Sequence, residues 1–499
     1  MIRWRRFRPA LILTFALVAG AAVSPSLIGC GTEESPLGRV FNVLSGQDIT
    51  LPPGAVRELE RFREVYDAYA ADAGKHRRFE QFRDAFKRVR FSYVREVADV
   101  TLIDAAIKGV RELNAEPGAV PAQELVETAL VSMMSALDPH SAYLNADELR
   151  DIQVTTKGEF GGLGIVVTME NGVVKVVSPI EDTPAFRAGL KSGDLITHVD
   201  GDPIKAKNIL RAVKKLRGPP GTDVRLTVDR SGQAPFDLTI TRAIIRVRSV
   251  RWRTEGAVGY IQVVNFSEKV ERGVEKAMES LRQDLGPRMK GLVLDLRNNP
   301  GGLLNQSLFL ADAFLEDGQI VAVRGRAVRE TVYEAKIGDL ANGVPMVVLI
   351  NGGSASASEI VASALQDHGR ATVMGLRSFG KGSVQTITRL PMEGGLRLTT
   401  ALYYAPSGRA IQARGVEPDI TLTRADADAK ESKRRRESDL PGALPAVAVG
   451  KPDARLTLKE TDCPEVGEKK DRVLGCALAL LRAGSQKEFL ASIGVHRSM

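Results

Sequence analysis

The sequence predicts a multidomain α/β protein with an N-terminal helical region, a strand-rich module that carries one helix, and a larger α/β core. At 499 residues the chain is too long for one compact core, so two to four domains are expected. Along the chain, apolar residues pass from helical spacing to short β-rich runs, and then to strands that alternate with helices. Hydrophobic residues make up 43% of the chain and charged residues 26%, which indicates that most of it is globular.

The first thirty residues predict a targeting segment. Four arginines precede Leu11–Val23, an uncharged run that is shorter than the roughly 20 residues of a transmembrane helix. This run leads to Leu27-Ile28-Gly29-Cys30, which resembles the lipobox of bacterial lipoproteins. We therefore expect residues 1–29 to be a lipoprotein signal peptide and Cys30 to become the acylated N-terminus. The alternatives are an ordinary signal peptide followed by a chance cysteine, or an uncleaved anchor.

This segment sets the expected location and partners. It predicts a chain attached to a membrane by its N-terminal lipid, on the periplasmic side of the bacterial cell envelope. The outer membrane is favoured, because Gly31 replaces the aspartate associated with inner-membrane retention. Residues 1–29 carry four arginines and no acids, so their removal lowers the formal net charge from +8 to +4. That modest charge, with only 5% aromatic residues, does not indicate nucleic-acid binding.

Composition and apolar periodicity divide the rest of the chain into five segments. They are a Gly-, Pro- and Ser-rich tether (30–54), a helical region (55–150), a strand-rich module (156–243), an α/β core (246–423) and a mobile linker with a Cys-bearing C-terminal tail (424–499). The helical region is the segment that could support a homo-oligomer. In an oxidising compartment Cys463 and Cys476 would form a disulfide, and two unpaired thiols are the alternative. No Cys or His cluster indicates a metal, and no cofactor is expected.

A serine in the core stands where a nucleophile can be held exposed. Asn351-Gly352-Gly353-Ser354-Ala355-Ser356-Ala357-Ser358-Glu359 follows the buried strand Met346–Ile350 and precedes a helix. A tight turn between a strand and a helix exposes the side chain of Ser356, and the helix start offers free backbone N–H groups to an oxyanion. A helix cap without chemistry is the alternative for this stretch.

The base that such a serine needs is predicted to be a lysine. His368 lies on the same predicted helix as Ser356, roughly 18 Å away at 1.5 Å per residue, and the other four histidines fall in other regions. Lys381 stands between two glycines 25 residues after Ser356, and burial in an apolar cleft would lower its pKa enough to release the proton. Gln385 could orient the lysine through its amide oxygen. An ordinary solvated turn lysine is the alternative.

A third loop completes the predicted site. Asp295-Leu296-Arg297-Asn298-Asn299-Pro300-Gly301-Gly302 follows a buried strand and precedes a helix. We assign the N–H of Gly301 or Gly302, together with that of Ala357, as the oxyanion hole. A plain turn between a strand and a helix is the alternative, and the glycine spacing matches neither phosphate-binding motif.

Together, these three blocks resemble the carboxy-terminal processing proteases, the tail-specific serine peptidase family. Similarity extends over about residues 90 to 423, including Leu137–Leu144 and Ile411–Ile420. The resemblance implies a Ser356/Lys381 dyad supported by Gln385, and an α/β core of the crotonase-like kind. It implies a serine endopeptidase.

The strand-rich module resembles a PDZ domain. Gly161-Gly162-Leu163-Gly164-Ile165 is similar to the PDZ carboxylate-binding loop, and Pro184–Leu190 fits the same pattern. The expected peptide-binding residues are Gly162, Leu163, Gly164, Ile165, Ile209 and Val213. Successive N–H groups of the loop would bind a C-terminal carboxylate, and the peptide would add as a strand beside Gly164–Thr168. A structural module with an unused groove is the alternative.

Three functions are consistent with these residues. The favoured one is an endopeptidase that cleaves exported proteins near their C-termini, with substrates that carry free apolar tails. The second is a proteolytically inactive PDZ-type adaptor that binds peptides without cutting them. The third is an acyl-transfer enzyme of the crotonase class, which the attached PDZ-like module and the export signal argue against.

Overall fold

The computed structural model describes residues 50–71, 75–170, 172–204, 209–246, 248–423, 435–447, 456–468 and 470–493. The predicted signal peptide, Cys30 and most of the predicted tether lie outside the described residues, as does the side chain of Ile209. None of the described helices is long and apolar enough to cross a membrane.

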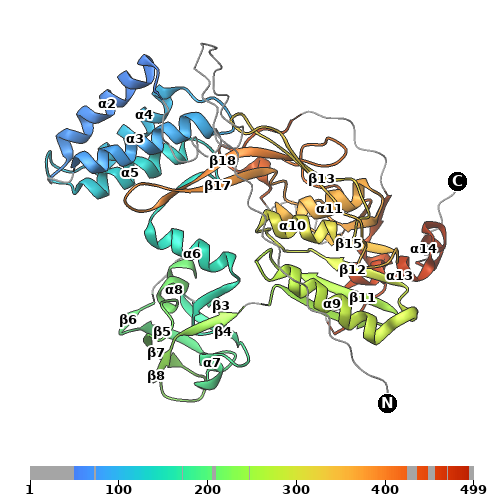
Figure 1. Ribbon diagram of the computed structural model, residues 1–499. Coiled ribbons are helices and arrows are strands. Elements are labelled where there is room, and N and C mark those ends of the chain that lie inside the picture. The colour runs from blue at the N-terminus through green and yellow to red at the C-terminus, as the bar shows by residue number, and fades with distance from the viewer. Residues whose placement is uncertain are drawn as a thin grey trace, which may run out of the picture.

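Four helices form the N-terminal helical region. They are α2 (Pro53–Tyr69), α3 (Lys75–Ser92), α4 (Asp99–Glu112) and α5 (Ala122–Ser135). Their apolar faces build one buried cluster, in which the Phe62 and Phe82 rings stack with centroids 3.9 Å apart. Leu396 and Leu398 of the core belong to the same cluster, so the helical region packs directly on the core. In Figure 1 these blue helices lie beside the orange strands β17 and β18.

The strand-rich module follows α6 (Ala146–Thr156), whose start is closed by an Asn145–Glu148 capping box. Its elements are β3 (Ile165–Glu170), β4 (Val173–Pro179), α7 (Pro184–Arg187), β5 (Leu195–Val199), β6 (Asp202–Pro203), α8 (Ile209–Leu216), β7 (Asp223–Asp229) and β8 (Phe236–Thr241). The sheet order β3-β4-β5-β7-β8 places β3 at an edge. Two short antiparallel strands, β2 (Glu159–Gly162) and β9 (Ala243–Arg246), form the neck between module and core. Figure 1 shows the module at the lower left, beneath the helical region and to the left of the core.

The core is built on a sheet of seven strands. Their order is β10 (Val250–Glu255), β11 (Val258–Val263), β12 (Gly291–Asp295), β15 (Met346–Ile350), β16 (Ala371–Gly375), β19 (Ile420–Thr423) and β20 (Leu456–Lys459). From β11 onward all neighbours are parallel. Leu292 and Leu294 face the cluster of the helices α9 (Val270–Leu285), α10 (Leu304–Asp312) and α11 (Ala357–Asp367). Val293 faces the opposite cluster, so both faces are covered, as continuous apolar strands require.

A second sheet completes the core, and the sequence did not predict it. It contains β1 (Ala142–Leu144), β13 (Gln319–Arg324), β14 (Thr331–Glu334), β17 (Ser383–Arg389) and β18 (Gly395–Tyr404). Strands β17 and β18 form a long antiparallel hairpin whose far end reaches the helical region. Because β17 begins two residues after Lys381, this residue lies where the chain passes between the two sheets.

The C-terminal segment differs from our expectation of a mobile linker. Strand β20 extends the main sheet, and the helices α13 (Arg472–Ala483) and α14 (Gln486–Ser492) cover its second face. Cys463 and Cys476 are joined by a disulfide. Within the described residues, short 3-10 helices occur at Gly286–Arg288, Glu437–Asp439 and Glu460–Asp462. The helical piece that we expected at about 470–492 is present as α13 and α14, whereas the charged composition before it led us to expect a mobile linker. Residues 424–434 and 448–455 of that linker lie outside the described residues.

Candidate active site

Three loops meet at the carboxyl ends of neighbouring parallel strands. We call them the oxyanion loop (residues 296–303, after β12), the nucleophile loop (351–356, after β15) and the lysine loop (376–382, after β16). Backbone bonds join them, since Ala355 N–H donates to Asn299 O at 3.0 Å and Phe379 N–H donates to Ser354 O at 3.0 Å. Parallel sheets place ligand-binding and catalytic loops at this edge. The three predicted blocks, far apart in sequence, are therefore adjacent.

Ser356 occupies the sharp turn between β15 and α11. Its backbone has φ 55° and ψ −113°, a left-handed conformation that a residue with a side chain seldom adopts. The side chain is half-buried rather than sealed in the core. Strained backbone of this kind clusters at functional sites, where the surrounding structure must hold it in place. The serine is thus presented on a forced turn at the start of a helix.

Glu359 holds that turn and the lysine loop together. Its side chain is fully buried, and its Oε2 accepts hydrogen bonds from Ser356 N–H at 2.7 Å and Lys381 N–H at 2.9 Å. Its Oε1 accepts from Gly380 N–H at 2.7 Å and from Ser378 Oγ at 2.5 Å. Because Ser356 and Lys381 share one oxygen atom, their backbone nitrogens lie within two hydrogen-bond lengths of each other.

Burial and hydrogen bonding act on Glu359 in opposite directions. Burial raises the pKa of Glu359 to about 7, and the four donors counteract part of that rise by stabilising the carboxylate. Sequence reasoning missed this residue as a site component. The signal for it was its place three residues after Ser356, in the position of a capping-box glutamate.

Lys381 is a half-buried lysine whose pKa is lowered by its surroundings. No hydrogen-bond or ion-pair partner of Lys381 Nζ is found in the described part of the chain. This means that the amine is not hydrogen-bonded to Ser356 Oγ in this arrangement. Burial lowers the pKa of Lys381, and the positive charge of Arg397 lowers it further, whereas Glu437, Glu359 and Asp138 oppose the shift. An unpaired lysine with a lowered pKa can accept a proton. Hydrogen bonds between catalytic groups often form or tighten only when substrate binds.

The backbone N–H groups of the oxyanion loop are not equivalent. Gly301 N–H donates to Asn299 Oδ1 at 2.9 Å, so of the two glycines that we assigned as alternatives it is the one whose N–H already has an acceptor. No acceptor is found for the N–H of Gly302 or Ala357 among the described residues. Gly301 lies directly against the serine, since a Cβ there would approach Ser356 Cβ to 2.9 Å. Gly302 and Ala357 remain the better pair of donors.

Among the described residues, no hydrogen bond is found between Gln385 and the Lys381 side chain. Its Nε2 donates to Ser383 Oγ at 2.9 Å and to Thr399 Oγ1 at 3.4 Å. Thr399 in turn donates to the buried Asp138, which also accepts from Ser141 Oγ at 2.5 Å. This chain of polar groups connects Gln385 to the turn before β1. Asp138 and Thr399 were missed because they are 261 residues apart in the sequence, and only the fold brings them together.

The module presents the predicted carboxylate-binding loop beside an open sheet edge. Among the described residues, no acceptor is found for the N–H of Leu163 or Gly164. Strand β3, which begins at Ile165, pairs only with β4 in the part of the chain that the structure describes. Val213 on α8 is half-buried. A C-terminal peptide requires successive free amides for its carboxylate and, beside them, a strand with one free edge to which it can add.

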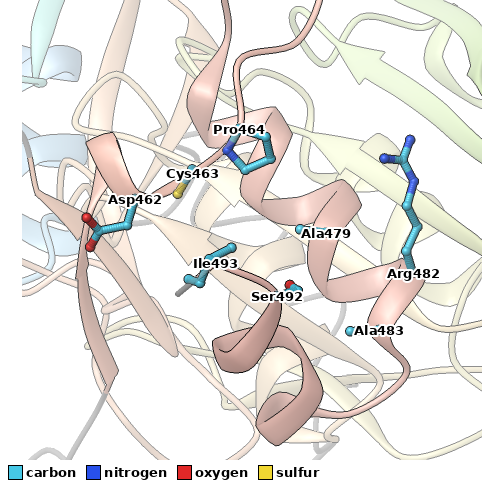
Figure 2. A pocket seen from close by; sticks show the side chains of 8 residues that line it. All are labelled: Asp462, Cys463, Pro464, Ala479, Arg482, Ala483, Ser492 and Ile493. Carbon is cyan, nitrogen blue, oxygen red and sulfur yellow. The ribbon is translucent and has the colours of Figure 1, made fainter. Parts of the chain in front are cut away.

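The pocket shown in Figure 2 lies elsewhere. It has a volume of about 570 Å³ and is lined by α13, α14 and the disulfide-bearing segment, including Arg482, Ile493 and Cys463. It contains neither Ser356 nor Lys381. No cluster of three or more potential metal ligands is found among the described residues.

Comparison with known proteins decides the family. Residues 257–422 match the model of peptidase family S41, and residues 161–239 match the PDZ domain. A carboxy-terminal-processing protease of Bartonella bacilliformis is 48% identical over 350 residues, which cover 70% of this chain and 75% of the relative. The chain belongs to peptidase family S41. The predicted family, its PDZ domain and its serine peptidase class are therefore confirmed.

The chain is also similar to other proteins named as processing proteases. The carboxy-terminal processing protease CtpA of Bacillus subtilis is 32% identical over 349 residues, covering 69% of this chain and 68% of the relative. Among solved structures, the photosystem II D1 C-terminal processing protease is 28% identical, covers 69% of this chain and 92% of that chain, and has a TM-score of 0.45.

Proposed function

We propose that this S41 peptidase is an endopeptidase that cleaves exported proteins near their C-termini, with Ser356 as nucleophile and Lys381 as general base. The observation that carries the proposal is the shared Glu359 oxygen, which holds the backbones of both residues. The lowered pKa of Lys381 supports its role as a base. Ser–Lys pairs are an established variant of the serine peptidase mechanism.

The proposed reaction has two halves. Neutral Lys381 takes the Ser356 proton as Oγ attacks the scissile carbonyl, and the Gly302 and Ala357 N–H groups stabilise the oxyanion. The Lys381 ammonium then donates its proton to the leaving amine, which breaks the peptide bond and leaves an acyl-enzyme. In the second half, Lys381 takes a proton from water as the water oxygen attacks the acyl carbon. The bond to Ser356 Oγ then breaks, the new carboxyl terminus is released, and the Lys381 ammonium returns the proton to Oγ.

We further propose that the PDZ domain captures the substrate's C-terminus. The N–H groups of Leu163 and Gly164 would bind the carboxylate, while the chain adds as a strand to β3. Half-buried Val213 would contact the apolar terminal residue. Replacing it with a charged residue (Val213→Glu) should weaken binding of a labelled apolar-tailed peptide about tenfold or more, since the new carboxylate would be buried and would repel the terminus.

The N-terminal residues support a location for this activity. We propose that Cys30 is lipidated and attaches the enzyme to the periplasmic side of the cell envelope, with the outer membrane favoured. A chain with Cys30→Ala should separate from the membrane fraction, whereas wild type should remain in it. Mass spectrometry of the mature N-terminus distinguishes an acylated Cys30 from an uncleaved signal.

The experiment that tests the dyad uses residues 31–499 and an unfolded protein with an apolar C-terminus. Ser356→Ala and Lys381→Ala should each lower kcat/KM about 10⁴-fold or more, because either change removes the activated nucleophile. Lys290→Ala, at an exposed lysine, is the control. Full activity in either dyad variant contradicts the proposal. A wild-type protein that binds the tail but never cuts it would instead indicate an adaptor.

A further inference from the structure

Residues 435–447, which we call the strap, lie against the lysine loop. The strap follows the region matched by the peptidase family model, which ends at residue 422. Its Glu437 N–H donates to Phe379 O at 3.2 Å, two residues before Lys381. Its Leu444 is buried. The strap therefore contacts the lysine loop, although the strap itself lies outside the region that the family model matches.

Gln412 connects the strap to the other side of Lys381. This residue is fully buried, and its Oε1 accepts from Gly382 N–H at 3.0 Å. Its Nε2 donates to Glu437 Oε1 at 3.0 Å and to Leu444 O at 3.2 Å. The contact between loop and glutamine is close, since a Cβ at Gly382 would lie 2.2 Å from Gln412 N. The side-chain amide of Gln412 therefore links the lysine loop to the strap by hydrogen bonds on both of its ends.

Glu437 is a buried carboxylate at the centre of this contact. It is 1% exposed, and its two oxygens lie 2.9 and 2.8 Å from His140 Nε2. His140 belongs to the turn whose Asp138 supports the Gln385 network. Deep burial of a carboxylate is costly unless its hydrogen bonds are satisfied, so the strap is specified in one position by these partners.

We propose that Glu437 is a positioning residue for the catalytic lysine, acting through Gln412 and the backbone of the lysine loop. Glu359 holds the lysine loop from the nucleophile side, and Glu437 with Gln412 holds it from the opposite side. This inference rests on the proposed role of Lys381 as general base. It assigns to the C-terminal segment a share in assembling the active site.

The negative charge of Glu437 is expected to raise the pKa of Lys381. Among the charged groups that act on Lys381, Arg397 lowers its pKa. Three carboxylates raise it, those of Glu437, Glu359 and Asp138. The groups next to Glu437 itself are Arg436 and His140. Replacing Glu437 by glutamine keeps an acceptor for Gln412 but removes one attraction for the ammonium. The pKa of Lys381 should then fall, and the acid limb of kcat/KM should move to lower pH.

The test measures kcat, KM and the pH profile for two variants of the 31–499 enzyme. Glu437→Ala should lower kcat about 10- to 100-fold with KM changed less than about threefold, because the peptide-binding residues are untouched. Glu437→Gln should keep most of kcat and shift the acid limb to lower pH. Asp439→Asn is the control, since it removes an exposed strap carboxylate and keeps the acceptor for Arg436 N–H.

The outcomes separate this inference from the proposed function. Wild-type kcat in Glu437→Ala, or an unshifted acid limb in Glu437→Gln, overturns the positioning role while leaving the dyad intact. If Glu437→Ala does not fold, the pH profile of Glu437→Gln still decides. If the Ser356→Ala variant cleaves as well as wild type in the same assay, the proposed function itself is overturned.

Discussion

Three loops of the peptidase core are joined to one another by buried hydrogen bonds, whereas the PDZ domain is joined to that core through a short neck. In the loops, one Glu359 carboxylate accepts four hydrogen bonds from two segments. At the neck, half-exposed Lys269 pairs with Glu159 at 2.6 Å beside the β2–β9 ladder. Bond-breaking needs atoms fixed within a fraction of an ångström, while capture of a tail tolerates a mobile attachment.

This difference predicts that small changes in the loops have large effects on chemistry, and that changes at the neck have small ones. After the dyad residues themselves, the largest effect is expected for Gly302→Ala. A Cβ at Gly302, where φ is 147°, would lie 2.2 Å from Phe266 O and would displace the proposed oxyanion donor. Loss of one such donor lowers kcat about 10²- to 10³-fold. Steady-state kinetics check this.

A matched control for that variant is Gly343→Ala. Gly343 also has a positive φ, 74°, but a Cβ there would meet nothing within 4 Å. The Gly343→Ala variant should have a slightly lower free energy of unfolding, because its backbone is strained, and an unchanged kcat. Equal losses of kcat in both variants would show that strain, rather than oxyanion stabilisation, explains the effect.

The next effect is expected for Glu359→Gln, with kcat reduced on the order of 10²-fold because two donors would face an amide N–H₂ group. The variant also tests a pH dependence. Burial raises the pKa of Glu359 to about 7, above the roughly 4.3 of an unfolded glutamate. Its protonation therefore stabilises the fold fully below about pH 4, and this contribution is lost as pH rises through about 7.

Denaturant unfolding at about pH 5 and about pH 8 measures that dependence. The free energy of unfolding of wild type should fall more between the two values than that of Glu359→Gln. Parallel pH dependences in the two proteins would indicate that Glu359 is ionised over the whole range.

The smallest effect is expected at the neck. Lys269→Ala removes the ion pair with Glu159, in which both side chains are about one-third exposed. Such pairs contribute little, so cleavage of a short peptide should change less than about twofold. A large loss of kcat in this variant would mean that the PDZ domain is coupled to the catalytic loops more tightly than its contacts indicate.

The sequence predicted the parts of the site that depend on local pattern. Ser356 and Lys381 were identified from a turn at a strand–helix junction and from a lysine between glycines, and the apolar strands of the main sheet from their composition. The β17–β18 hairpin was not predicted, because residues such as Thr386 and Thr388 carry no continuous apolar run. Glu437 lies after a dense basic run that resembles a solvated linker, and only its long-range contacts show that it is buried.

The central claim is that neutral Lys381 removes the serine proton, and exchanging its amine for a less basic one tests this most directly. Lys381→Cys in residues 31–499 adds a thiol to a chain whose other two cysteines are disulfide-bonded. Aminoethylation of that thiol yields a lysine analogue with a less basic amine. We predict that Lys381→Cys is inactive, and that alkylation restores cleavage with an acid limb at lower pH than in wild type. Restored cleavage with an unshifted limb, or full activity before alkylation, would contradict the account.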